Sequence, residues 1–303
     1  MLKRCLAVLM IFAALPLRAE PPRVAVDILP VHSLVARVMD GIAVPGLVMP
    51  ASASPHSHAM RPSEAAALES ADVIVWLGPA LTPWLADAIV TLATDAHSLT
   101  LLDLGETETL AYRDGEDFEV DDHDHDHAHG DHGAPDPHAW LDPENAIAWL
   151  RVVADALADA DPENADHYRA NAKAGAAEIA AVAADLVTTL APMHDTPFLV
   201  FHDSTQYFEA RFDLAAAGAL SLADGAGPGP AHVAELRDRV AETGVACLLA
   251  EPGTNPGLAE AVLGESGARL VEIDPLGVAF EPGPHAYPAL LASLGEAFSR
   301  CVE

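Results

Sequence analysis

Basic residues are scarce in this sequence. Of its 303 residues, 15 are lysine or arginine and 46 are aspartate or glutamate, which gives a formal net charge of -31 at pH 7. We therefore expect no nucleic-acid partner, because phosphate contacts need clustered lysine and arginine. Aromatic residues are also few, at 5%, but 51% of the residues are hydrophobic, which is ample for folded cores. An acidic folded protein of this composition is well suited to bind metal cations.

The N-terminal apolar run is too short to cross a membrane. Lys3 and Arg4 precede an apolar run over 6–15, and Leu17-Arg18-Ala19 forms a small-residue cleavage site. A spanning helix needs about twenty apolar residues, so the segment 1–19 is predicted to be a secretory signal peptide. We expect secretion of the chain and no spanning helix in its mature part.

Cysteine is nearly absent, with three in the whole chain. Removal of the predicted signal peptide leaves only Cys247 and Cys301. In an oxidising compartment such a pair predicts one structural disulfide, and two unpaired thiols are the alternative.

The order of the predicted elements indicates an α/β protein. Short β-branched runs alternate with long Ala/Leu-rich stretches, which is the pattern of parallel sheets with flanking helices. The length suggests two domains at about 100 to 200 residues per domain. A helix opened by Asp161-Pro162 runs to about Leu190 and is roughly 40 Å long. The predicted strands are Val24 to Ile28, Ala43 to Val48, Val73 to Leu77, Phe198 to Phe201, Ala246 to Ala250 and Arg269 to Ile273.

The long helix divides the predicted chain into two lobes. We expect an N-terminal lobe over 20–160, a linking helix over 161–191 and a C-terminal lobe over 192–303. Ligands of open α/β sheets gather at the carboxyl ends of the strands. The functional site is therefore predicted to lie between the lobes.

One segment, 115–135, belongs to no predicted core. It interleaves aspartates with five histidines, namely His123, His125, His127, His129 and His132. Histidine-rich tracts bind metals by composition, so these residues are predicted to be weak auxiliary ligands. The alternative is a charged, solvated loop without a role.

Four residues occupy the exits of predicted strands or the loops before helices. They are His56, His138, His202 and Asp274, two in each half of the chain. Three imidazoles and one carboxylate form a tetrahedral set suited to zinc, whereas hard cations prefer mostly oxygen ligands. Taken singly, each residue also has an ordinary interpretation as a loop, core or turn residue. The other histidines are expected on the surface in helical or turn contexts, namely His97, His167, His194, His232 and His285.

These segments resemble a known family, the zinc-binding cluster A-I solute-binding proteins of bacterial ABC transporters. The resemblance covers nearly the whole mature chain. It is carried by Pro55-His56 with Arg61-Pro62-Ser63, Asp136-Pro137-His138-Ala139-Trp140-Leu141-Asp142-Pro143, Phe201-His202-Asp203, Glu251-Pro252 and Asp274-Pro275-Leu276-Gly277. The His/Asp-rich insert and a disulfide to the C-terminal end are also typical of the zinc members.

The resemblance implies two pseudo-symmetric lobes, a linking helix and zinc bound by His56, His138, His202 and Asp274. A histidine at the third position favours zinc, where a glutamate is typical of manganese or iron. His58 stands where a tyrosine is common, so it either competes with His56 or supports it. The implied partners are an ABC permease and its ATPase, with a periplasmic metallochaperone as a candidate supplier of zinc. The resemblance also implies a location in the periplasm, and we expect a monomer without enzymatic activity.

Three other functions remain open at this point. A zinc hydrolase needs three protein ligands and a bound water, but Asp274 would fill the fourth position, and the chain has no His-Glu-x-x-His segment. A periplasmic zinc buffer would use the histidine-rich segment alone. A manganese or iron importer is disfavoured by His202.

Overall fold

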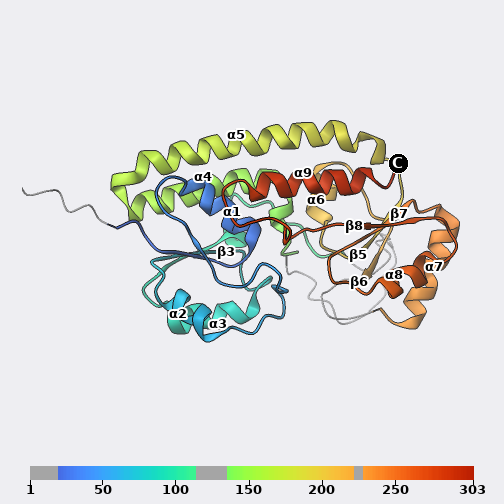
Figure 1. Cartoon of the computed structure of the whole chain (residues 1–303), viewed down its shortest axis with the longest axis horizontal. Helices are drawn as coiled ribbons and strands as arrows, with labels where there is room; N and C mark the ends of the chain where they lie inside the picture. Colours follow the sequence, from blue (N-terminus) through green and yellow to red (C-terminus); the bar gives the residue numbers. More distant parts are fainter. Residues whose placement is uncertain (1–19, 114–134, 222–227) are drawn as a thin grey trace, which may run out of the picture.

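The computed structural model describes residues 20–113, 135–221 and 228–303. The predicted signal peptide and the five histidines of the insert lie outside the described residues. The chain forms two lobes, each built on a four-stranded parallel sheet, with a long helix running along both (Figure 1).

The N-terminal sheet has the strand order β2-β1-β3-β4. β1 lies at its centre, where Val26 is paired with Leu47 on one side and Val75 on the other. The strands are β1 (Val24–Val26), β2 (Gly46–Leu47), β3 (Val73–Trp76) and β4 (His97–Thr100). The helical segments of this half are α1 (Leu29–Val38), α2 (Pro62–Glu69), α3 (Pro83–Leu92), η1 (Leu101–Asp103), η2 (Ala139–Leu141) and α4 (Pro143–Ala160).

The C-terminal sheet repeats this arrangement, in the order β6-β5-β7-β8. Its strands are β5 (Phe198–His202), β6 (Ala219–Ser221), β7 (Cys247–Ala250) and β8 (Arg269–Glu272). Its helices are α6 (Gln206–Arg211), α7 (Pro230–Thr243), α8 (Pro256–Leu263) and α9 (Ala286–Ser299). Because both sheets place their first strand second and their last strand at an edge, the predicted pseudo-symmetric α/β architecture is confirmed.

The edge strands β4 and β6 were not predicted. β4 begins with the polar pair His97-Ser98, both exposed, and β6 is only three residues long. Short edge strands with polar or small residues lack the continuous apolar run of a buried parallel strand. The placement of His97 in a helical or turn context was therefore wrong. His232 was also expected at the surface, but it is buried in α7, and its Nε2 lies 2.9 Å from the carbonyl oxygen of Ala219.

Proline opens several helices, as the sequence predicts. The Asp142 carboxylate accepts a hydrogen bond from the Glu144 N–H at the start of α4, and the Asn255 side chain does the same for Gly257 in α8. Such caps satisfy N–H groups that have no partner within the helix. Asp161 does not cap the long helix in this way. Its carboxylate accepts hydrogen bonds from the side chains of Asn164 and Tyr168. The residues Pro162–Asn164 form a separate 3-10 helix, η3.

The linking helix α5 (Ala165–Leu190) starts after η3 and is followed by η4 (Ala191–Met193). It packs against α1, α4 and α9, so helices from both ends of the chain lie along it (Figure 1). By length and apolar composition alone, the stretch Pro162–Met193 could cross a membrane, and the expectation of no spanning helix in the mature chain stays a prediction. One face of α5 packs against the two lobes, but only 22% of its most apolar window is buried. Many of its other residues are alanine, the strongest helix former. The predicted boundaries at 160/161 and 191/192 stay predictions.

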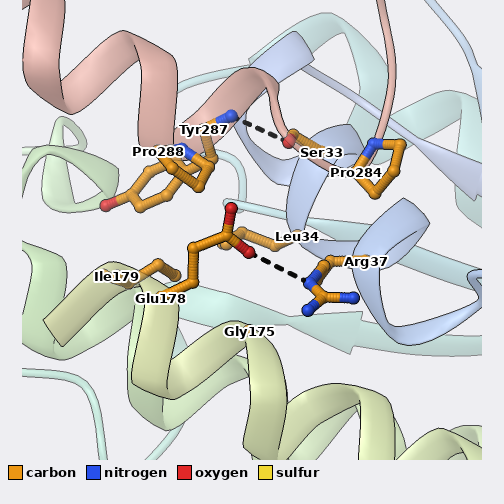
Figure 2. A pocket seen from close by; sticks show the side chains of 9 residues that line it. All are labelled: Ser33, Leu34, Arg37, Gly175, Glu178, Ile179, Pro284, Tyr287 and Pro288. Carbon is orange, nitrogen blue, oxygen red and sulfur yellow. Dashed lines mark hydrogen bonds and ion pairs between the residues drawn. The ribbon is translucent and has the colours of Figure 1, made fainter. Parts of the chain in front are cut away.

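The largest of three hydrophobic core clusters extends through both lobes. It includes Val26 of β1, Trp149 of α4, Phe198 of β5 and Leu294 of α9, all at most 2% exposed. The linking helix α5 meets α1 and α9 around Gly175. There, Arg37 Nε lies 3.4 Å from the Glu178 carboxylate (Figure 2). The predicted disulfide is present and joins Cys247 at the start of β7 to Cys301 after α9, with the two Cα atoms 5.3 Å apart.

Candidate metal centre

Three of the four predicted ligands converge at the boundary between the lobes. One ring nitrogen from each of His56, His138 and His202 lies within 4.8 Å of the others. The ring centroids of His138 and His202, one from each lobe, are 5.1 Å apart. A tetrahedral zinc ion at 2.0–2.1 Å from each nitrogen would bring the nitrogens to about 3.4 Å from one another. Small side-chain shifts therefore suffice to coordinate such an ion.

His138 is oriented by a carboxylate two residues earlier in the chain. It is buried at the start of η2, and Asp136 Oδ1 accepts hydrogen bonds from its Nδ1 at 2.7 Å and its backbone N–H at 2.9 Å. A carboxylate can only accept, so Nδ1 carries the proton and Nε2 keeps its lone pair. This carboxylate–histidine pair is the usual arrangement around histidine ligands of metals.

His202 ends β5 and has a carboxylate neighbour of its own. Its Nδ1 lies 3.4 Å from Glu251 Oε1, and Ser204 Oγ donates to the same oxygen at 2.7 Å. Glu251 follows the last residue of β7, the strand beside β5. The sequence analysis quoted Glu251-Pro252 without assigning it a role. The sequence signal for such a role was the position of Glu251, directly after the predicted strand Ala246 to Ala250.

His56 lies in the loop between β2 and α2 and is half-buried. Trp84 Nε1 donates to the Pro55 carbonyl at 2.7 Å, which fixes the loop next to His56. His58 Nε2 donates to Glu64 Oε2 at 2.8 Å, and its ring packs edge-on against Trp84. Although desolvation acts the other way, hydrogen bonds from the Arg61 N–H and from His58 lower the pKa of Glu64. His58 therefore supports the loop and does not belong to the group of converging nitrogens.

Asp274 is not part of the group that the three histidines form. It follows β8 and is half-buried, and its Oδ2 accepts a hydrogen bond from the Ala279 N–H at 3.0 Å. The adjacent Pro275 carbonyl accepts a 2.9 Å hydrogen bond from Trp140 Nε1, which links this turn to the segment that carries His138. The role of Asp274 as the fourth ligand stays a prediction.

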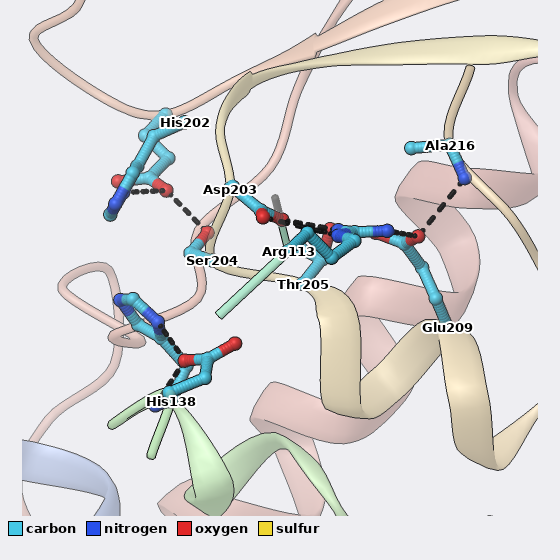
Figure 3. A network of polar contacts seen from close by, with 10 residues as sticks. Arg113, His138, His202, Asp203, Ser204, Thr205, Glu209 and Ala216 are labelled. Carbon is cyan, nitrogen blue, oxygen red and sulfur yellow. Dashed lines mark hydrogen bonds and ion pairs between the residues drawn. The ribbon is translucent and has the colours of Figure 1, made fainter. Parts of the chain in front are cut away.

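Buried acidic residues surround the histidines. Asp203, next to His202, and Glu209 of α6 share the guanidinium of Arg113, which reaches across from the N-terminal half (Figure 3). Burial raises the pKa of Asp203, while its hydrogen bonds with Arg113 act in the opposite direction. Desolvation together with the charges of Asp136 and Asp203 raises the pKa of Tyr112 to about 12. The negative charge favours a cation at this boundary.

Two parallel-sheet lobes joined by a helical spine, with three histidines meeting at their boundary, define a metal-binding protein of the two-lobe solute-binding class. A sequence model of the family described as zinc-uptake complex component A, periplasmic (ZnuA), matches residues 24–301, and the chain belongs to this family. The resemblance drawn from the sequence is thereby confirmed.

Curated relatives and solved structures agree with this assignment. The high-affinity zinc uptake system protein ZnuA of Paracoccus denitrificans is 39% identical over 308 residues, covering 96% of this chain and 94% of the relative. The protein of the same name in Brucella abortus is 35% identical, covering 96% and 95%. A crystal structure of ZnuA superposes with a TM-score of 0.78 at 23% identity, covering 94% of this chain and 100% of that one.

A similar fold also occurs in a protein crystallised with another metal. FpvC of Pseudomonas aeruginosa, solved in complex with Mn²⁺, has a TM-score of 0.77 at 20% identity, covering 93% of this chain and 98% of that one. The fold alone therefore does not determine which metal is bound. The choice of metal depends on the donor atoms of the site.

Proposed function

We propose that this protein captures Zn²⁺ in the periplasm and delivers it to an ABC permease that is driven by its ATPase. The observation that carries the proposal is the convergence of His56, His138 and His202 within 4.8 Å at the boundary of the lobes. Membership of the periplasmic zinc-uptake family supports it. Residues 1–19 would act as the signal peptide that brings the chain to this compartment.

The donor set favours zinc over manganese or iron. Imidazole nitrogens suit zinc, whereas manganese favours carboxylate and water oxygens. Asp274 is the proposed fourth ligand, and it would complete a closed tetrahedral site without an open position for a reactive water. Closed coordination supports a transport role and argues against a hydrolase. Because histidine ligands must be neutral, binding should weaken as the pH falls towards about 6.5, the ordinary imidazole pKa.

A competition titration tests the proposal. Metal-free protein of residues 20–303 competes with a chromophoric chelator for Zn²⁺, and we expect one tight equivalent. His138→Ala and His202→Ala should each remove tight binding, and Asp274→Ala should weaken it. His194→Ala is the matched control, because His194 is exposed in the turn after η4. Retention of tight binding in His202→Ala would contradict the proposed centre.

The histidine-rich insert is the second part of the proposal. Its flanking residues are described: Ala111 and Pro135 form an antiparallel bridge, and Asp136 contacts the ligand His138. We propose that His123, His125, His127, His129 and His132 collect zinc weakly beside the tight site, an effect of high local concentration. A periplasmic metallochaperone would be an additional source of zinc for the tight site. We also propose that the protein acts as a monomer.

Deleting residues 121–132 separates the proposed function from a zinc buffer. We expect the variant to keep one tight equivalent, to lose weak equivalents and to load more slowly from a limiting, chelated zinc source. Loss of all tight binding would mean that the insert is the site and would support the buffer. Tight binding of Mn²⁺ with weak binding of Zn²⁺ would support the manganese importer.

A further inference from the structure

Arg113 forms a charged contact across the boundary between the lobes. It is the last described residue before the insert, and it follows the segment that is bridged to Pro135. Its Nε donates to both carboxylate oxygens of Asp203 at 3.1 Å, and its Nη1 donates to Glu209 Oε2 at 2.7 Å. Both acceptors belong to the C-terminal lobe, so one side chain joins the base of the insert to that lobe (Figure 3).

The carboxylates that bind Arg113 are among the most buried charged groups of the protein. The side chains of Asp203 and Glu209 are 3% and 2% exposed. Glu209 also accepts from Thr205 Oγ1 at 2.6 Å and from the Ala216 N–H at 3.0 Å. Buried charges require a partner and hydrogen bonds to offset their lost hydration. The guanidinium supplies both to two carboxylates at once through its planar set of donors.

The position of Asp203 connects this cluster to the metal centre. Asp203 directly follows His202 in the chain, and its backbone N–H donates to the Ser221 carbonyl at 3.1 Å. The peptide between His202 and Asp203 is therefore held on one side by the sheet and on the other by Arg113. On the N-terminal side, Asp136 orients His138, and its backbone carbonyl accepts a 2.7 Å hydrogen bond from Tyr207 Oη of α6.

We propose that Arg113 is a positioning residue of the metal centre, which sets the placement of His202 relative to His138 by holding Asp203 and Glu209 from the opposite lobe. The inference rests on the proposed function, because it needs the three histidines to bind zinc. It assigns a role to a residue that binds no metal itself. It also makes the base of the insert part of the support of the tight site.

A second arginine offers a matched comparison. Arg211 of α6 crosses the same boundary in the opposite direction, and its Nη2 lies 2.6 Å from Asp142 and 3.0 Å from Glu108. Neither of these carboxylates is adjacent to a histidine of the centre in the chain. Arg211→Met thus removes an ion pair between the lobes without touching the neighbour of a ligand.

The test compares wild type, Arg113→Met and Arg211→Met by three measurements. These are the Zn²⁺ dissociation constant by competition, the visible absorption spectrum with Co²⁺ as the probe metal, and the melting temperature of the metal-free protein. We expect Arg113→Met to weaken Zn²⁺ binding at least tenfold, as removal of supporting contacts around metal ligands does, and to alter the Co²⁺ spectrum. Arg211→Met should leave the dissociation constant within about twofold and the spectrum unchanged.

A triple variant covers the case in which Arg113→Met does not fold. Arg113→Met with Asp203→Asn and Glu209→Gln removes the cation together with both carboxylates that it balances. If Arg113 positions His202, this variant recovers melting temperature while its Zn²⁺ binding stays at least tenfold weaker than that of wild type. Recovery of both properties would overturn the inference, because charge balance alone would then explain Arg113.

The remaining outcomes are equally decisive. A lower melting temperature in Arg113→Met with an unchanged dissociation constant and Co²⁺ spectrum would overturn the positioning role and leave the proposed function intact. Absence of a tight zinc equivalent in the wild-type protein would overturn both the positioning role and the proposed function. The competition titration of the wild type detects this outcome.

Discussion

At the scale of single residues, the Asp136 carboxylate orients His138, one of the proposed ligands. Its Oδ1 accepts from both the ring and the backbone of His138. We expect Asp136→Ala to weaken Zn²⁺ binding by about tenfold or more, because His138 loses the group that fixes its tautomer and orientation. Asp136→Asn keeps an acceptor oxygen and should lose less. Competition titration measures both, and equal affinities for wild type and Asp136→Ala would contradict the role.

Asp27 is a second buried carboxylate, at the end of β1. Its two oxygens accept from the Ile28 and Leu77 N–H groups, yet burial raises its pKa from 3.8 to about 7. Between these values the folded chain holds a proton that the unfolded chain has lost, so stability falls as the pH rises from about 4 to 7. The difference corresponds to on the order of 4 kcal/mol.

Asp27→Asn removes this titration. The variant loses some stability at every pH, because one backbone contact is weakened. From pH 4.5 to pH 8 we expect the free energy of unfolding to fall more in the wild type than in the variant. Urea unfolding of the metal-free proteins at both values measures the slope. Asp72→Asn is the control, because hydrogen bonds from Arg23 lower the pKa of Asp72. Its carboxylate is therefore ionised throughout this pH range, and its replacement should leave the slope as in wild type. Parallel slopes for wild type and Asp27→Asn would refute the prediction.

Some residues of the centre could be predicted from the sequence and others could not. His138 and His202 were predictable because each adjoins a clear helix cap or an apolar strand, and parallel strands end on one side of a sheet. Arg113 gave no such signal, and Glu251 gave only its position after the predicted strand Ala246 to Ala250. Their roles depend on how the two lobes are placed relative to each other, which no local pattern records.

At the scale of elements, the close approach of α5 to α1 depends on Gly175. A Cβ at this position would lie 2.8 Å from Arg37 Cγ and 3.2 Å from Leu150 Cδ1. We expect Gly175→Val to lower stability by about 1–3 kcal/mol, since overpacking outweighs the gain in helix propensity. Ala174→Val, at an exposed position of the same helix, is the control. Melting temperatures that fall equally in both variants would contradict the prediction.

The elements themselves were predicted unevenly. The central strands β1, β3, β5 and β7 are fully or nearly fully buried and carry apolar runs that the sequence displays. Edge strands such as β4 and β6 owe their pairing to the neighbouring strand rather than to their own composition. The proline-opened helices were predictable because the cap lies within the sequence itself.

At the scale of the whole molecule, the disulfide closes a stretch of 54 residues in the C-terminal lobe. In the chain-entropy view such a closure contributes roughly 4 kcal/mol. We expect Cys247→Ser with Cys301→Ser to lower the melting temperature and to leave the zinc dissociation constant within a few-fold. Cys247 opens β7, whereas Glu251 follows the other end of that strand. Reduction of the wild-type protein should give the same fall, and a large loss of affinity would contradict this separation.

The bridge between Ala111 and Pro135 has a consequence for how this family can diverge. The chain leaves and re-enters the fold at neighbouring points, so residues can be gained or lost between them without moving either sheet. The entropy of closing a loop changes by only about 0.6 kcal/mol for each doubling of its length. A change in the length of the segment between these two points therefore costs little closure entropy and need not disturb the pairing of Ala111 with Pro135.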